Sequence, residues 1–502
     1  MSNHLKNETS LYLKDHFNTP VNWYPYGSEA LQKAKEERRP IFLSIGYSGS
    51  YWCQVMKEES FKNETIAQLL NENFIAIKVD KDERTDIDKY YKQVYKLMNG
   101  QNCASPLCVF LTEDQEPFYS AGYIAPTPKG NVLGMEELLN VVINKYRDDH
   151  ATMRAKGEEV LNYLNPKMHS IEATRLTLNV VKTIQLHAQN LIDQEHGGFD
   201  NEPKFLHIST LDLLLESYQH TKDHRLLSYV QLSLDKMIEG EIHDTKEGGF
   251  YRYANTKSWG LPRQEKLLYD NALMVPLLLN TYQITQNITY KNIAFDTLEF
   301  LFQKHSDGSL FYANSFENRD TKMIIDPKIV TSFNAMIINA LFYASQFEKK
   351  YLDIAINALD RLLDQYYQDK ELYHTQNIKA FLEDYAYLSE ALLTAHEITE
   401  NTRYLILAEE LVNHAIEQFY EYGRWKFSNN ALPLYDDIYD LLYPSSLATM
   451  LFSLHRLSFK IDSDYNPLVF KTLELNSHAL MRQPLSSPKM SKVLLRHLKK
   501  ML

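Results

Sequence analysis

Acidic side chains stand next to the starts of helices in the second part of the chain, where they could serve acid–base chemistry. Glu265, Asp270 and Asn271 surround one predicted helix start, and Glu383 and Asp384 open another. A carboxyl group can exchange protons with a substrate, but carboxylates at a helix start are also stabilised by the helix dipole. If the group is functional, we expect Glu265 and Asp384 to be catalytic and Asp270, Asn271 and Glu383 to bind substrate.

Aromatic residues occupy turns between the predicted helices. Trp259 and Trp425 fall in such turns, together with Tyr251, Tyr253 and Phe427. Aromatic faces stack on sugar rings in binding pockets, and they also attach loops to helices. Trp259 is the predicted stacking residue. The loop carboxylates Asp436 and Asp437 either bind sugar hydroxyls or are solvated.

Cysteines and histidines offer further candidates for chemistry. Three cysteines, Cys53, Cys103 and Cys108, are too few for a disulfide framework or a four-ligand zinc site, so we expect reduced thiols. There is no His-Glu-x-x-His zinc pattern, no glycine-rich phosphate loop and no Gly-x-Ser-x-Gly elbow, so no metal and no cofactor is predicted. Four histidines lie in turns where an acid–base pair could form: His196, His243, His305 and His374.

Composition indicates a folded, helix-rich protein. Of 502 residues, 44% are hydrophobic and 24% are charged, and only 16 are glycine, which argues against a turn-dense β architecture. The formal net charge is −12, which argues against a nucleic-acid partner. The short basic run from Arg496 to Lys500 is interpreted as a solvated helix end. The longest apolar run, Ala272 to Leu279, is too short to span a membrane, and we expect a cytoplasmic location.

Residues 1–165 alternate between predicted helices and strands. The apolar segments Ile41 to Tyr47 and Phe74 to Asp80 are predicted strands, separated by a helix over Gln54 to Glu72. Two further strand signals precede an amphipathic helix at Met135 to Tyr146. This alternation predicts an α/β domain with a mainly parallel sheet.

Residues 166–502 are predicted to be all-α. No proline occurs between Lys328 and Leu432, and about twelve segments show the helical period. Similar turn motifs recur at steps of 51 to 62 residues, at Gly198, Gly249, Gly308, Lys370 and Gly423. Such periodicity indicates stacked helical hairpins. Six hairpins can close into an (α/α)6 toroid or form an open solenoid.

Several motifs resemble those of the thioredoxin-like family that includes spermatogenesis-associated protein twenty. They are NTPVNWYPYG, IFLSIGYS, NFIAIKVDKDERTDID, SPLCVFLTED, GGFDNEPKF, EKLLYDNA, KIVTSFNAMI and LEDYAYL. The resemblance implies an N-terminal thioredoxin fold followed by a six-hairpin toroid similar to those of sugar epimerases and certain glycosidases. Because members share no established reaction, it implies fold more than function.

The sequence departs from the family pattern at the redox motif. Where the family has Cys-x-x-Cys, this chain has Ser50 and Cys53, so the attacking thiol is missing and dithiol exchange is not expected. Cys53 is then a buried structural residue, a one-cysteine site or a partner of Cys103. Pro106 is retained, and the thioredoxin-like order predicts a cis Ser105–Pro106 bond.

Two functional hypotheses follow. The first is a protein that binds or isomerises a carbohydrate in the toroid cavity. The second is a non-catalytic interaction or chaperone-like module that uses the thioredoxin fold to bind a protein partner. An open cavity rich in carboxylates and aromatics favours the first, and an apolar plug favours the second.

Overall fold

The computed structural model describes residues 3–164, 173–199, 201–318, 321–430, 432 and 434–500. The chain divides into two compact units. The first contains Met1–His169 and Glu317–Lys328, and the second contains Ser170–Phe316 and Ile329–Leu502. The predicted boundary after residue 165 lies outside the described residues. The sequence did not predict that Glu317–Lys328 groups with the first unit.

The first unit is built on a five-stranded sheet with the order β1-β3-β2-β4-β5. Its strands are β1 (Tyr24–Pro25), β2 (Ile41–Gly46), β3 (Ile75–Asp80), β4 (Leu107–Leu111) and β5 (Pro117–Ala121). β3 pairs in parallel with β1 and β2, whereas β4 pairs antiparallel with β2 and β5. The expectation of a mainly parallel sheet was therefore wrong, because the last two strands form a hairpin.

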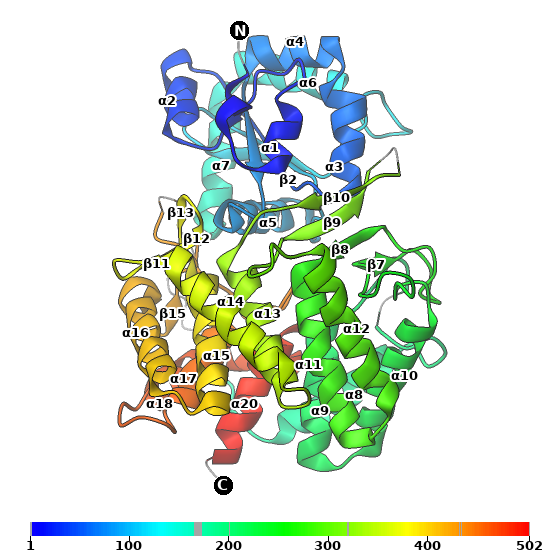
Figure 1. Cartoon of the computed structure of the whole chain (residues 1–502). Helices are drawn as coiled ribbons and strands as arrows, with labels where there is room; N and C mark the ends of the chain where they lie inside the picture. Colours follow the sequence, from blue (N-terminus) through cyan, green and yellow to red (C-terminus); the bar gives the residue numbers. More distant parts are fainter. Residues whose placement is uncertain are drawn as a thin grey trace. The chain divides into compact units, whose positions relative to one another are not determined.

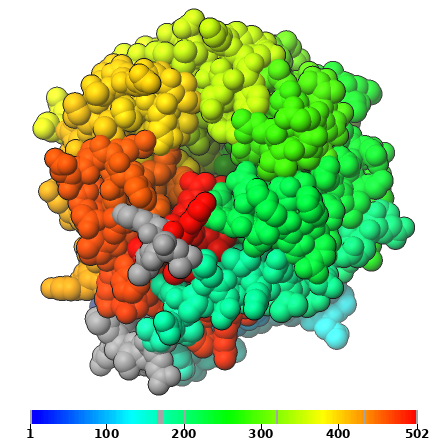
Figure 2. All heavy atoms as spheres, turned by 90° about the horizontal axis from the view of Figure 1, so that it is seen from below, coloured from blue at the N-terminus to red at the C-terminus, as the bar shows by residue number. Residues whose placement is uncertain are grey.

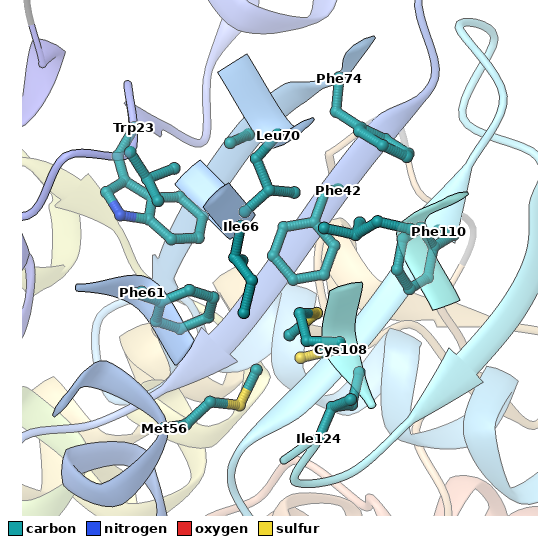
Figure 3. Packing of buried hydrophobic residues seen from close by; sticks show 14 of the residues in the cluster. Trp23, Phe42, Met56, Phe61, Ile66, Leu70, Phe74, Cys108, Phe110 and Ile124 are labelled. Carbon is teal, nitrogen blue, oxygen red and sulfur yellow. The ribbon is translucent and has the colours of Figure 1, made fainter. Parts of the chain in front are cut away.

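Helices surround this sheet and enclose an aromatic core. They are α1 (Leu11–His16), α2 (Ser28–Glu37), α3 (Tyr51–Met56), α4 (Glu64–Asn73), α5 (Thr85–Asn99), α6 (Met135–Asp148) and α7 (His150–Leu164). The predicted helix over Gln54 to Glu72 is interrupted by a π-helical turn at Lys57–Phe61. Figure 3 shows Trp23, Phe42, Phe61 and Phe110 packed together in the core. This unit also contains β10 (Met323–Asp326).

The second unit consists of helical hairpins that stand side by side (Figure 1) and close into a ring. In the described chain, six inner helices contact one another in the order α9, α11, α13, α15, α17 and α20, and α20 returns to α9. This contact closes the ring and excludes the open solenoid, so the thioredoxin-like plus (α/α)6 fold class is confirmed. The inner helices are α9 (Ile208–Thr221), α11 (Leu268–Thr285), α13 (Thr331–Ser345), α15 (Leu382–Thr399), α17 (Ser446–Leu457) and α20 (Pro488–Lys500).

Outer helices alternate with the inner ones along the chain. They are α8 (Asn179–Leu191), α10 (His224–Glu239), α12 (Ile288–Lys304), α14 (Lys350–Tyr366), α16 (Thr402–Phe419) and α18 (Asn466–Leu475), and the short α19 (Ser477–Arg482) precedes α20. α14 buries residues at steps of three and four, so one face packs inward. α13 is buried almost all round, because it has neighbours on every side. None of the helices in the described part of the chain has the length and apolar character that a membrane span requires.

The repeated turns connect each outer helix to the next inner helix. The residues that mark them have positive φ: 72° at Gly198, 77° at Gly249, 96° at Gly308, 67° at Lys370 and 89° at Gly423. These turns carry short antiparallel strands, which are β6 (Lys204–Phe205) with β7 (Tyr253–Ala254), β8 (Glu265–Leu267) with β9 (Asn314–Glu317), β11 (Tyr367–Gln368) with β12 (Glu371–Thr375), β12 with β13 (Ile378–Lys379), and β14 (Tyr420–Glu421) with β15 (Arg424–Trp425).

Candidate functional site

A cavity of about 470 Å³ runs along the axis of the ring in the second unit. All six inner helices contribute to its lining. Seen from below Figure 1, the ring surrounds a central depression beside the red C-terminal helix α20 (Figure 2). The volume is within the range of small-molecule sites.

One side of this cavity is strongly charged. Its carboxylates come from α9 and α15, and its cations come from α17 and α20. The eight charged residues are Asp212, Glu216, Glu390, Glu397, Arg456, Lys489, Lys492 and Arg496.

These charges form ion pairs between the inner helices. Lys492 lies 2.7 Å from Asp212, and Arg496 makes two hydrogen bonds to Glu216, at 3.0 and 2.9 Å. Lys489 lies 2.7 Å from Glu390. On the neighbouring helix, Arg456 lies 2.7 Å from Glu397. α20 is thus tied to α9 and α15 by charge as well as by packing.

Ion pairs in the cavity favour the charged forms of Glu216 and Lys492. Although burial alone would raise it, the hydrogen bond from His220 and the cations of α20 hold the pKa of Glu216 far below its usual range. Burial likewise opposes the charge of Lys492, but Asp212 and Glu216 raise its pKa above the usual value. Groups held in this way bind hydroxyls well but are poorly suited to proton transfer near neutral pH.

The other side of the cavity is uncharged. α11 and α13 contribute an apolar wall that includes Ala272, Pro276 and Met336, and polar groups that include Asn339 and Tyr343. Tyr343 donates a hydrogen bond to the amide oxygen of Asn280. The Oδ1 atom of Asn339 is buried and has no hydrogen-bond partner among the described residues.

Aromatic rings close the opposite end of the ring, where the inner helices begin. Tyr269 of α11 lies 5.0 Å from Phe333 of α13 and 5.0 Å from Tyr443, measured between ring centroids. Tyr443 lies just before α17, which stands across the ring from α11, so this contact crosses the axis.

Glu383 and Asp384 lie at this closed end, next to a predicted histidine. Both oxygens of Asp384 lie 2.9 Å from His374 Nδ1, and Glu383 accepts a 2.7 Å hydrogen bond from Tyr443. Asp384 also accepts hydrogen bonds from the backbone N–H groups of Ser332 and Phe381. It therefore caps the starts of both α13 and α15. His374, Glu383 and Asp384 are the three groups in the described chain close enough to hold a metal ion, but all are fully buried.

Trp259 and Asn271 are also fully buried. The indole N–H of Trp259 donates a 2.8 Å hydrogen bond to the His196 carbonyl, and its ring packs against Gly198. Asn271 makes three hydrogen bonds, all with backbone groups of Phe250 and Leu267. Both side chains hold turns of the ring in place.

Glu265 and Asp270 lie in β8 and in the first turn of α11, and both are buried. Glu265 is 3.7 Å from Arg252. Among the described residues that line the cavity, none belongs to the six candidates Glu265, Asp384, Trp259, Asp270, Asn271 and Glu383.

The predicted histidines do not form an acid–base pair in the cavity. His196, His243, His305 and His374 lie in separate turns, and the described lining contains no histidine. Burial lowers the pKa of His305 to about 4, and its Nε2 lies 2.7 Å from Ser315 Oγ. Burial also lowers the pKa of His243.

The charged residues of the cavity were not among the residues predicted from the sequence. Arg496 was interpreted as part of a solvated helix end, but it is paired with Glu216 inside the ring. The available signal was spacing: Lys489, Lys492 and Arg496 recur at three and four residues, so they share one face of a helix.

In the first unit, Ser50 and Cys53 begin α3. The Ser50 hydroxyl caps this helix by accepting a 3.3 Å hydrogen bond from the Cys53 N–H. Burial raises the pKa of the Cys53 thiol, and all three cysteines are free thiols. The predicted cis Ser105–Pro106 bond is confirmed, and Glu202–Pro203 is also cis. A groove of about 300 Å³ is lined by Pro106, Trp52 and Tyr123, and the two aromatic rings lie in contact, 5.0 Å apart between centroids.

Residues 2–165 match the family model described as "Protein of unknown function, DUF255". The N-terminal region thus matches the DUF255 family. The chain is 35% identical to an uncharacterised protein of Caenorhabditis elegans over 323 residues. This match covers 63% of the chain and 44% of the relative. Spermatogenesis-associated protein 20 of Mus musculus is 34% identical over 328 residues, which are 63% of this chain and 41% of that protein. The match therefore spans less than half the length of these relatives.

Solved structures share the ring that follows the DUF255 region. D-mannose isomerase matches with a TM-score of 0.53 and 13% identity, over 67% of this chain and all of that one. A sugar epimerase from a ruminal bacterium matches with a TM-score of 0.51 and 12% identity, over 60% of this chain and 85% of that one. At these identities the likeness concerns the six-hairpin fold.

Proposed function

We propose that the ring of the second unit binds a small carbohydrate in its central cavity. The observation that carries this proposal is a cavity of about 470 Å³ in which one wall offers ion-paired donors and acceptors and the other offers amides and apolar side chains. Hydroxyl groups both donate and accept hydrogen bonds, so they suit such a lining. A sugar epimerase and a D-mannose isomerase have rings of similar fold, which agrees with this ligand class.

The proposal is for binding, and isomerisation is not part of it. Proton transfer at a sugar carbon needs a group that gives and takes a proton near neutral pH. Despite burial, cationic neighbours instead stabilise Glu216 and Glu397 as ions and lower the pKa of each carboxyl. The predicted catalytic pair, Glu265 and Asp384, lies outside the cavity lining.

Calorimetric titration of the whole chain with D-mannose, D-glucose and cellobiose tests this function. We expect saturable binding of at least one sugar, and its loss when the cavity is blocked by Ala335→Trp. Solvent-deuterium incorporation, followed by NMR, should stay at background. Absence of binding by every sugar would contradict the proposal.

A second candidate function is protein binding by the groove of the first unit. Trp52 is 43% exposed and borders this groove together with Pro106 and Tyr123. Large aromatic side chains are typical anchors of protein interfaces. Capture of a partner that is lost on Trp52→Ala but kept on Tyr163→Ala, an exposed aromatic elsewhere in this unit, would support this function.

A further inference from the structure

The charges that line the central cavity balance one another. Its described lining has four carboxylates and four cations, and each lies within 2.7 to 2.9 Å of an opposite charge. A charged ligand would have to separate one of these pairs or enter without a counter-ion. Both cost electrostatic free energy, most of all at the Lys489–Glu390 pair, where both side chains are largely buried.

The paired groups nevertheless keep hydrogen-bonding capacity for neutral hydroxyls. A carboxylate offers about four acceptor positions, and guanidinium and ammonium groups offer several donors. Arg496 uses two of its N–H groups on Glu216. The charged wall can therefore bind alcohols without losing its ion pairs.

The opposite wall has acceptors that lack a protein donor. Asn339 Oδ1 is buried without a partner among the described residues. Pro276 lies inside α11 and has no N–H, so it cannot donate the helical hydrogen bond to the carbonyl of Ala272. Ala272, Pro276 and Asn339 all line the cavity. A hydroxyl group bound here would satisfy the Asn339 amide oxygen.

The same wall is apolar between these acceptors. Leu273 and Leu277 of α11 and Met336 of α13 line it. A sugar ring has an apolar C–H face and hydroxyls on its edges, whereas an open-chain polyol has no such face. Contact with this wall therefore favours the cyclic form.

We infer that the cavity selects an uncharged pyranose, an inference that rests on the proposed function. Its C–H face packs on α11 and α13, one hydroxyl donates to Asn339 Oδ1, and other hydroxyls bind the ion-paired groups of α9, α15, α17 and α20. Anionic sugars, amino sugars and acyclic polyols are discriminated against.

A titration series with the intact chain tests this selectivity. The probes are D-mannose and D-glucose, with D-glucuronate, D-glucosamine and D-mannitol as the anionic, cationic and acyclic analogues. We expect the neutral pyranoses to bind at least about tenfold more tightly than each analogue, a difference of about 1.4 kcal/mol. If an analogue binds as well as the neutral sugars, the selectivity is wrong while sugar binding stands. If none of the five binds, the proposed function itself fails.

Two variants, with one control, test which residues of the cavity produce the selectivity. Asn339→Ala should weaken binding of the neutral sugar about tenfold, and Asn190→Ala, an exposed change on the outer helix α8, should not. Lys489→Met leaves Glu390 without its partner and should raise affinity for D-glucosamine relative to D-glucose. Unchanged ratios in a folded Lys489→Met protein, or unchanged affinity in Asn339→Ala, would overturn the inference.

Discussion

Asn271 and Asn334 make the same three hydrogen bonds in successive hairpins of the ring. Each side-chain oxygen accepts from the backbone N–H of a phenylalanine in the preceding turn, Phe250 or Phe311. Each side-chain nitrogen donates to the carbonyl of that phenylalanine and to the carbonyl four residues before the asparagine. The two amides thus join a repeated turn to the inner helix that follows it.

This relationship predicts a structural cost for Asn271→Ala. The change leaves buried backbone groups of Phe250 and Leu267 without their partner, at about 1–3 kcal/mol each. We expect the free energy of unfolding in urea to fall by about 2–4 kcal/mol, and Asn334→Ala to behave alike. Asn190 is exposed, so Asn190→Ala should leave the free energy of unfolding unchanged. Normal stability together with lost sugar binding would instead support the substrate-binding role predicted for Asn271.

The sequence predicted the elements of the ring better than its site. The turn markers recur because each hairpin needs a residue with positive φ, and this requirement is visible as Gly198, Gly249 and Gly308. Strand Ile41–Gly46 was equally clear from its apolar run. Such local requirements are fixed by residue type, so they can be read from one sequence.

Predicting the site required knowing which end of the ring is open, and the sequence does not show this. Trp259 lies in a turn, where exposure is the usual expectation, but close packing against Gly198 and Gly240 buries it. Tyr387 is buried as well, because its helix α15 is an inner one with neighbours all round. Whether such residues are buried depends on contacts between hairpins that are distant in the sequence, such as the contact of Tyr269 with Tyr443. These contacts leave no pattern in the local sequence.

Asp384 is predicted to be essential for folding. It is fully buried and accepts hydrogen bonds from His374 and from two helix starts. Asp384→Ala should lower the free energy of unfolding by about 3–5 kcal/mol, as expected when one partner of a buried charged group is removed. Asp360→Ala, at an exposed pair with Arg403 outside the cavity, should cost no more than about 1 kcal/mol. A stable Asp384→Ala protein with impaired sugar binding would contradict this role.

The first unit should lack dithiol oxidoreductase activity. Ser50 stands where an attacking thiol is needed, and the Cys53 thiol is 2% exposed with a raised pKa caused by burial. Insulin reduction should therefore stay at background, and Cys53→Ser should not change it. Because Ser50 Oγ already lies 3.3 Å from Cys53 N, Ser50→Cys should permit a local disulfide, detected as two titratable thiols in the variant instead of the four present after reduction. Cys53-dependent turnover in the natural chain would refute this prediction.

Lys78 should make the stability of the first unit depend on pH. Its ammonium group lies in the core, 4.3 Å from the ring centroid of Phe61 and 4.7 Å from that of Trp23, and it donates one hydrogen bond to Ser44. Burial lowers the pKa of Lys78 from 10.5 to about 7. Between these values the unfolded chain binds more protons than the folded one, so the free energy of unfolding rises with pH. Below about pH 7 both states are protonated and the full cost is present.

Lys78→Met should remove this dependence and stabilise the protein. At about 1.4 kcal/mol for each pKa unit, the cost removed at neutral pH is on the order of 4 kcal/mol. Urea unfolding between pH 7 and 8.5 is the appropriate measurement. At higher pH the thiols of partly buried Cys103 and buried Cys108 oppose the trend, because burial raises the pKa of each to about 12. Lys62→Met, at an exposed lysine, is the matched control and should keep the natural slope. If Lys78→Met keeps that slope as well, Lys78 is not its source and the prediction is wrong. In the natural protein the ammonium group would then be charged and would have a partner in the core.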